Sequence, residues 1–314
     1  MSTDLRSWID RLRKEGELVD VRAPVDPELE ITEITDRVSK AGGPALLFHD
    51  VLGSELPVLI NQFGSEKRMN MALNTESLDA VGGRITDLLE LQPPQGIAAK
   101  VRALGTLRQL ASFSPKNVTS APCQEVWVDP PDLTRLPVLT CWPDDGGPFI
   151  TLPLVFSKDP TTGVRNCGMY RIQVVDERTA MMHWQIHKDG AAHLRDSQGR
   201  VEVAIAIGTA PATTYSASAP LPPGIDEMLF AGFLGGRSVP NHPPRPLDAQ
   251  RPAETENVSE GYLDAHDQRP EVPFGDHTGF YTPVDDYPTL HVTGMSMRRE
   301  AVYATTIVGK PPME

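Results

Sequence analysis

Residues 164–188, VRNCGMYRIQVVDERTAMMHWQIHK, are the stretch from which we interpret the rest of the chain. They alternate as two β-strands would, on either side of a turn at residues 176–179. Polar side chains interrupt both faces of the pattern, where at least one face should be apolar: these are Asn166, Arg171, His183 and His187. Burying such a group without a partner costs roughly 2 kcal/mol or more. We therefore expect the stretch to hold a site for an anion or a metal ion.

The sequence on the C-terminal side of residue 124 has the texture of an antiparallel barrel or sandwich. Short apolar runs, among them EVWVD, LPVLTCW, FITLPLVF and VEVAIAIG, are separated by Pro, Gly, Asp and Asn. One helix interrupts them, with Ile225, Met228, Leu229 and Phe233 predicted inward and Gly235–Gly236 as its stop. Residues 238–256 are polar and rich in proline, so we expect a long surface connection there. Strand texture returns at residues 260–266 and 290–298.

The first 115 residues predict a small α/β domain. Leu5, Trp8, Ile9 and Leu12 repeat at helical spacing after the cap candidates Ser2, Thr3 and Asp4, and Gly16 stands where that helix would stop. The further predicted elements are a strand at 18–25, a helix at 27–40, strands at 44–49 and 56–61, and helices at 66–73, 78–91 and 97–113. Residues 112–124 have the composition of a linker. We therefore expect an N-terminal α/β domain at 1–115 and a second domain at 116–314, in an α+β protein.

Composition excludes several classes of protein. The chain has 29 basic and 42 acidic residues, a net charge of −13, and no basic cluster with interleaved aromatic residues, so nucleic acid is not an expected partner. The chain has three cysteines, Cys123, Cys141 and Cys167, an odd number without CxxC spacing. This favours buried, reduced thiols in a cytoplasmic protein. No apolar run approaches the roughly 18 residues of a membrane span. We expect a soluble cytoplasmic protein.

Asn166, His187 and Glu227 are candidate metal ligands. One amide oxygen, one imidazole and one carboxylate form a hard N/O set that suits Mn²⁺ or Mg²⁺ better than zinc, with positions left open for a phosphate. The alternative is structural: Asn166 caps a turn, His187 has its own hydrogen-bond partners, and Glu227 is solvated in the first turn of its helix. Spacing alone does not decide between the two. An i, i+4 pair of His183 and His187 is a weaker metal motif, because it lacks the Glu of HExxH.

Arg171, Glu271 and Asp276 are candidate acid–base residues. The two carboxylates flank the apolar turn VPFG at residues 272–275, which would present both to one point. An arginine between them would lower the pKa of the nearer acid by about 1–3 units, while burial would raise that of the other, leaving one acid as a proton donor. The alternative is an arginine–carboxylate pair that fixes a loop.

A phosphate seat is predicted at the short helix opened by Lys188, because helix N-terminal amides and a lysine both favour anions. Trp184 and the neighbouring Met169–Tyr170 could flank a planar ring, although such residues on strands are more often core. The chain has no GxGxxG, P-loop or GxSxG motif, which disfavours dinucleotide, nucleotide triphosphate and serine hydrolase sites.

Taken together, the motifs resemble the UbiD family of reversible decarboxylases. The resemblance runs from about Asp4 to Pro312 and rests on four linked segments in the family's order and spacing: NCGMYR at 166–171, HWQIHK at 183–188, PGIDE at 223–227 and PFGDHTG at 273–279. It implies a small N-terminal α/β domain followed by a split antiparallel β-barrel that binds flavin. Val272 departs from the glycine usual in the last motif, which would stiffen the turn.

The resemblance also implies a cofactor and roles for individual residues. The cofactor would be prenylated FMN, its phosphate bridged to Mn²⁺, with K⁺ nearby, by Asn166, His187 and Glu227. Residues lining it would be Met169, Tyr170, Arg171, His183, Trp184, Gln185, His187 and Lys188. Arg171, Glu271 and Asp276 would form the catalytic network, with Asp276 as proton donor.

The implied reaction is the non-oxidative, reversible decarboxylation of an aromatic or α,β-unsaturated carboxylic acid. Loss of CO₂ from an sp² carbon requires an electron sink, which the cofactor would supply, while protein groups orient and protonate. A flavin prenyltransferase would provide the cofactor, and the full-length form would be a homo-oligomer.

Family members continue into a third, C-terminal domain, whereas this chain stops at Glu314. We therefore also consider an impaired flavin-binding fragment without its lid domain, and an ordinary FMN oxidoreductase on the same barrel.

Overall fold

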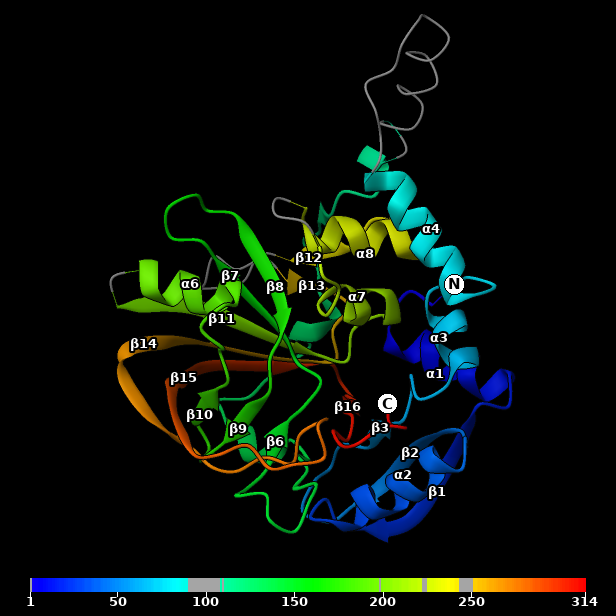
Figure 1. Cartoon of the computed structure of the whole chain (residues 1–314), viewed down its shortest axis with the longest axis horizontal. Coiled ribbons are helices and arrows are strands. Elements are labelled where there is room, and N and C mark those ends of the chain that lie inside the picture. Colours follow the sequence, from blue (N-terminus) through cyan, green and yellow to red (C-terminus); the bar gives the residue numbers. More distant parts are fainter. Residues whose placement is uncertain (1, 90–107, 109, 198, 222–224, 243–250) are drawn as a thin grey trace, which may run out of the picture.

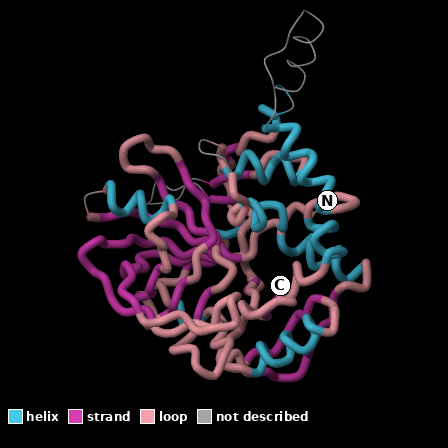
Figure 2. Tube along the Cα trace, in the orientation of Figure 1, coloured by secondary structure: helices cyan, strands magenta, loops and turns pink. Residues whose placement is uncertain are grey.

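The structure, a computed structural model, describes residues 2–89, 108, 110–197, 199–221, 225–242 and 251–314. Most helices gather on one side of the molecule and the strand-rich part lies on the other (Figure 2). The N-terminal part is a small α/β unit, and a curled antiparallel sheet follows it (Figure 1). The predicted α+β class is therefore confirmed. None of the helices in the described ranges is long and apolar enough to cross a membrane.

Helix α1 (Leu5–Lys14) begins where the sequence predicts, because Asp4 caps it. The Asp4 carboxylate accepts a hydrogen bond from the Ser7 backbone N–H at 2.9 Å, and the Asp4 N–H donates to the Ser7 hydroxyl at 3.1 Å. Such a reciprocal cap stabilises a helix by about 1 kcal/mol. The predicted apolar face is buried.

The first sheet has the strand order β1-β2-β3-β16. Its strands are β1 (Leu18–Val25), β2 (Ala45–Val51), β3 (Val58–Ile60) and β16 (Tyr303–Ala304), and the helices beside it are α2 (Glu30–Lys40), α3 (Glu66–Ala72) and α4 (Leu78–Leu89). β16 comes from the far end of the chain and pairs with β3 in parallel. Both ends of the chain therefore build this sheet.

The second sheet is antiparallel, with the order β6-β9-β10-β15-β14-β11-β7-β8 and β5 paired with β15. Its strands are β5 (Val126–Trp127), β6 (Phe149–Ile150), β7 (Leu154–Lys158), β8 (Arg165–Met169), β9 (Ile172–Val174), β10 (Thr179–Met182), β11 (Arg200–Ile207), β14 (Asn257–Glu271) and β15 (Asp285–Met297). The long β14 and β15 form a ribbon, the β14–β15 ribbon, whose connecting loop spans residues 272–284.

The second sheet must curl, because only Tyr170 and Arg171 join β8 at one end of the strand order to β9 near the other. In a flat sheet six strand spacings would separate β8 from β9, about 29 Å. The two-residue connection spans at most about 11 Å. The predicted single strand at 164–175 is thus wrong: it is two strands, and the break between them closes the half-barrel.

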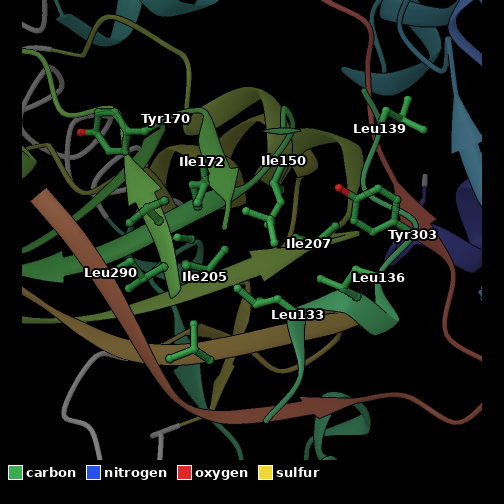
Figure 3. Close-up of a cluster of buried hydrophobic side chains, with 14 of the residues drawn as sticks. Leu133, Leu136, Leu139, Ile150, Tyr170, Ile172, Ile205, Ile207, Leu290 and Tyr303 are labelled. Carbon is green, nitrogen blue, oxygen red and sulfur yellow. The ribbon is translucent and has the colours of Figure 1, made fainter. Parts of the chain in front are cut away.

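The interior of the half-barrel is continuous with the core beneath the first sheet. Ile172, Ile205 and Leu290 point inward from β9, β11 and β15, and Leu139 and Tyr303 extend the same cluster toward the N-terminal unit (Figure 3). All five are almost completely buried. Burial of an aliphatic side chain of this size contributes roughly 1.5–3 kcal/mol, so the two units share one stabilising core.

Three further helices lie beside the half-barrel: α6 (Asp189–Asp196), α7 (Pro211–Ser216) and α8 (Glu227–Gly235); the single turns η1 (Pro122–Gln124) and η2 (Leu133–Arg135) precede it. Helix α8 ends at Gly236, whose φ of +64° favours glycine, as predicted. Its buried positions include Met228, Phe230 and Leu234. Leu229 and Phe233, predicted inward, are only half-buried, and so is Ile225, which precedes the helix. The helix is apolar on most of its surface, so periodicity could not locate its buried face.

Two predicted segments differ in the structure. The helix predicted from Pro27 begins at Glu30, because Leu29 has a φ of +65° and the Glu28 N–H is tied to the Asp26 carboxylate. Residues 238–256 are not simply a surface connection: they contain β12 (Pro240–His242) and β13 (Arg251–Pro252), which form a third sheet with β4 (Lys116–Asn117). Arg251 is fully buried and pairs with Glu260. Most of the helix predicted at 97–113 lies outside the described residues.

Candidate active site

Arg171 lies at the connection between β8 and β9 and reaches the end of β14. Its Nη2 lies 2.5 Å from Oε2 of Glu271, and its Nε lies 3.4 Å from Oε1. Nη2 also donates to the Thr282 hydroxyl at 3.3 Å. The side chains of Arg171 and Glu271 are 11% and 1% exposed, so water and salt weaken the attraction between their charges much less than at the surface. The structure therefore brings together two of the three predicted acid–base residues.

The loop 272–284 is held against this pair by its backbone. The Val272 N–H donates to the Gln173 side chain at 3.1 Å, and the Gly275 N–H donates to Asp145 at 2.7 Å. A Cβ at Gly275 would lie 2.3 Å from the Trp142 ring, so only glycine fits there. The Phe274 ring is buried, and the Arg171 guanidinium carbon lies 4.7 Å from its centroid, a cation–π contact.

Asp276 lies on the same loop but pairs with its neighbour. Its Oδ1 accepts hydrogen bonds from the backbone N–H and from Nδ1 of His277, each at 2.7 Å. Burial raises the pKa of Asp276, but the His277 hydrogen bonds and the charge of Arg171 outweigh burial, and the pKa is lowered overall. In this arrangement Asp276 is therefore an anion at neutral pH.

His183 is placed differently from the prediction that the strand continues through HWQ. Strand β10 ends at Met182, and residues 183–188 are not part of a strand. Nδ1 of His183 lies 2.9 Å from Oε2 of Glu271, the oxygen that Arg171 also contacts. The His183 ring packs on Tyr287 of β15, with centroids 4.3 Å apart. His183 thus belongs to the Arg171 cluster.

The remaining residues expected to line a cofactor lie in two segments, one just before β9 and one just after the end of β10. Trp184 and Tyr170 are buried and pack edge to face, 6.0 Å apart, and Met169 is half-buried. Gln185, His187 and Lys188 are exposed on the turn before α6. A cleft of about 680 Å³ separates this turn and α6 from the β14–β15 ribbon; it is lined by residues that include Gln185, His187, Arg195, Gln268 and Tyr287.

Asn166 and Glu227, two of the predicted metal ligands, belong to β8 and to the start of α8. Oε2 of Glu227 accepts a hydrogen bond from the Cys167 N–H at 3.2 Å. Burial, and then the charge of Asp226, raise the pKa of Glu227 to about 7. Asn166 is buried and its amide lies 3.4 Å from the Tyr170 hydroxyl. Glu227 is half-buried, and a cation beside a partly desolvated carboxylate would stabilise its charged form.

The residues that precede these two are joined by an ion pair that sequence reasoning missed. Nη2 of Arg165 lies 2.8 and 2.6 Å from the two oxygens of Asp226, and Asp226 also caps α8 through the N–H groups of Met228 and Leu229. His187, on its exposed turn, is not hydrogen-bonded to Asn166 or Glu227 among the described residues. No group of three His, Cys, Asp or Glu side chains in the described ranges is arranged for a metal.

Sequence reasoning also missed the partners of the Arg171 cluster. Thr282, Tyr287 and Asp145 belong to no recognisable motif, and their importance follows only from where the β14–β15 ribbon and the loop before β6 fold. The one available signal was His183, a polar residue that breaks an apolar strand pattern.

Two family models match the chain. The 3-octaprenyl-4-hydroxybenzoate carboxy-lyase Rift-related domain matches residues 116–311, and the N-terminal domain of the same carboxy-lyase matches residues 9–85. The chain belongs to the UbiD family. An uncharacterized protein of Archaeoglobus fulgidus is 47% identical over 315 residues, and one of Aquifex aeolicus is 48% identical over 318. These alignments cover 99% of this UbiD-family chain and 65% of each relative, so the chain spans about two thirds of their length.

Solved UbiD-class structures share the fold. An evolved dimeric form of HmfF from Pelotomaculum thermopropionicum, in complex with prFMN, is 27% identical with a TM-score of 0.84, covering 99% of this chain and 69% of that one. The closed form of vanillic acid decarboxylase from Sedimentibacter hydroxybenzoicus is 25% identical with a TM-score of 0.86, covering 100% and 66%. The recognition of the UbiD family from sequence is confirmed.

Proposed function

We propose that this chain carries the catalytic centre of a prenylated-FMN-dependent carboxy-lyase, which decarboxylates an aromatic or α,β-unsaturated carboxylic acid reversibly and without net oxidation. The observation that carries the proposal is the buried Arg171–Glu271 pair, which presents a guanidinium beside a second acid, Asp276. Related structures support the class: HmfF was solved with prFMN and with FMN, and another related structure is a vanillic acid decarboxylase.

The residues present suit the proposed cofactor and ions. Asn166, His187 and Glu227 offer the oxygen and nitrogen donors that Mn²⁺ prefers, and burial, which raises the pKa of Glu227, is a cost that a bound cation would offset. We propose that they hold Mn²⁺ at the cofactor phosphate, with K⁺ nearby. Met169, Tyr170, Arg171, His183, Trp184, Gln185, His187 and Lys188 are the proposed lining.

Arg171 is the proposed substrate anchor. Glu271 occupies its Nε and Nη2, which leaves Nη1 to bind the substrate carboxylate through a charge-assisted hydrogen bond. When bound, prenylated FMN would supply the electron sink for loss of CO₂. The protein's own contribution is to orient the acid and to keep water from the reacting carbon.

Asp276 is the proposed proton donor. It is an anion in the structure, so it must take up a proton before it can act as an acid. Binding of the substrate carboxylate would favour this protonation, because a second negative charge nearby raises the pKa of a carboxyl group. Asp276 would then protonate the carbon from which CO₂ has left.

The proposal extends to partners and setting. A flavin prenyltransferase would supply the cofactor, the protein would form a homo-oligomer, and the three free, buried cysteines suit a reducing cytoplasm.

The test is to co-express the chain with a flavin prenyltransferase in the presence of Mn²⁺, purify it, and identify bound small molecules and metals by mass spectrometry. Prenylated FMN with near-stoichiometric Mn²⁺, followed by turnover of vanillate, cinnamate or 2-furoate, is the expected result. Plain FMN reduced by a nicotinamide cofactor would indicate an oxidoreductase instead. Cofactor without turnover of any acid would indicate an impaired flavin-binding fragment.

A further inference from the structure

We propose that His183 is a positioning residue for the reaction centre: its imidazole holds Glu271 in place and thereby fixes the guanidinium of Arg171. The inference rests on the proposed function, in which Arg171 binds the substrate carboxylate. Arg171, at the connection of β8 and β9, and His183, at the end of β10, both meet one carboxylate oxygen of Glu271, at the end of β14.

The shared oxygen determines which atom carries the proton. Oε2 of Glu271 lies 2.5 Å from Nη2 of Arg171 and 2.9 Å from Nδ1 of His183. A carboxylate only accepts, so Nδ1 must be the protonated ring nitrogen. The Glu271 side chain is 1% exposed, so water does not replace a donor that is lost. His183 therefore satisfies a lone pair that Arg171 alone leaves free.

The backbone and a neighbouring ring keep the imidazole in this position. The His183 N–H donates to the Arg171 carbonyl at 3.2 Å, which extends the β9–β10 pairing by one residue. The ring lies against Tyr287, whose strand β15 is paired with the strand that carries Glu271. His183 is thus fixed relative to both partners before any ligand arrives.

Because Glu271 is held in place, the orientation of the Arg171 guanidinium is fixed as well. A guanidinium bound to a carboxylate that can swing would carry its free Nη1 along with it. A carboxylate held from two directions cannot swing, so Nη1 keeps one orientation toward the substrate. Misplacement of a binding group by about 1 Å can cost a reaction roughly 10²-fold, so a residue that never touches the substrate can control its turnover.

The competing explanation is that the His183 ring merely fills space beside Tyr287. Two substitutions separate the explanations. In His183→Asn the side-chain N–H₂ lies close to the position of Nδ1, so the donor stays and the ring is lost. In His183→Phe the ring stays on Tyr287 and the donor is lost.

His291 provides a matched control on the same ribbon. Its Nε2 lies 2.8 Å from an oxygen of Asp267, and its ring stacks on Tyr262 with centroids 5.0 Å apart. It is thus also a histidine between a carboxylate and a tyrosine, but its carboxylate does not contact Arg171. His291→Phe measures what the loss of such a hydrogen bond does to the fold alone.

The experiment measures melting temperature, the Kd of vanillate and of cinnamate, and the kcat and KM of the acids that the cofactor-loaded wild type decarboxylates. His183→Phe should weaken acid binding and lower kcat/KM by roughly 10-fold or more, the value of a charge-assisted hydrogen bond. His183→Asn should restore most of that loss, and His291→Phe should leave acid binding unchanged.

Two results would overturn the inference. If His183→Asn is the more damaging variant, or if His183→Phe binds and turns over the acids as the wild type does, the ring and not the donor matters. A wild type that neither binds nor decarboxylates any acid is a different failure, because it removes the proposed function and the inference together.

Discussion

Arg171 and Glu271, 100 residues apart in sequence, form a two-point ion pair between the connection that closes the half-barrel and the end of β14. Nε and Nη2 of the guanidinium contact Glu271, and this contact fixes the direction in which the remaining nitrogen, Nη1, points. Under the proposed function, this fixed geometry would aim Nη1 at a substrate carboxylate, which a pair that only stabilises a loop has no need to do.

Replacement of Arg171 by lysine tests that geometry. Lysine keeps the charge but cannot contact both carboxylate oxygens and a substrate in fixed directions. We expect kcat/KM to fall roughly 10²-fold, with little change in melting temperature. Arg13→Lys, at an exposed pair with Asp20, is the control. Turnover close to that of the wild type would show that Arg171 contributes charge alone.

Replacement of Asp276 by asparagine removes the proposed proton donor while keeping size and polarity. We expect turnover to fall roughly 10²-fold or more, the usual contribution of a general acid, with the Kd for the acid little changed. Asp144→Asn, at an exposed position of another loop, should have no effect. Incorporation of deuterium from D₂O into the product reports the protonation directly, and an unchanged rate of incorporation would contradict the assignment.

The Arg165–Asp226 ion pair should control metal affinity, because it holds the residues next to Asn166 and Glu227 together. Asparagine is also a good N-cap, so Asp226→Asn keeps the cap of α8 and weakens the ion pair. We expect Mn²⁺ to bind about 10-fold more weakly, as when groups that orient metal ligands are changed, measured by titration calorimetry. Asp132→Asn, which alters the cap of η2 in the same way, is the control. Equal Mn²⁺ affinity in both variants would argue against the site.

Glu227→Gln should change the pH dependence of stability in the metal-free protein. The pKa of Glu227 is raised from 4.5 to about 7, so between these values the folded state holds a proton that the unfolded chain has released. Wild-type stability should therefore fall as pH rises through this window, and the glutamine variant should lack that loss. At pH 8 we expect the variant to melt roughly 2–4 °C higher. Addition of Mn²⁺ should reverse the order by stabilising only the wild type. If the melting temperatures of the wild type and of Glu227→Gln change with pH in the same way from pH 4 to 8, the pKa of Glu227 is not raised.

Local patterns in the sequence predicted much of the fold correctly. The cap at Asp4, the apolar face of α1 and the stop at Gly236 depend on neighbouring residues, which a sequence displays directly. The pairing of β16 with β3 depends on residues nearly 250 positions apart, and no local signal encodes it. The division of the chain after residue 115 stays a prediction, since the first sheet also takes a strand from near the C-terminus.

The candidate site was predicted in part. Arg171 and Asn166 could be singled out because charged or polar residues are rare in apolar strand patterns. Glu271 stood out as a carboxylate beside the apolar turn at 272–275, and Glu227 as a carboxylate at the start of a predicted helix. Their partners could not, because Thr282, Tyr287 and Asp226 are ordinary residues of loops, strands and helix caps until the chain folds. The lowered pKa of Asp276 was also hidden, since it depends on the rotamer of His277.

The two-residue connection at Tyr170 and Arg171 links folding to recognition. Until β8 and β9 have been drawn to the two ends of one curled sheet, Arg171 has no fixed surroundings, and Glu271 arrives only with a ribbon from much later in the chain. Such distant pairings form slowly compared with local helices. A partly folded molecule would therefore contain every residue of the site and yet bind no carboxylic acid. The rate at which acid binding appears during refolding would report when the last strand pairings form.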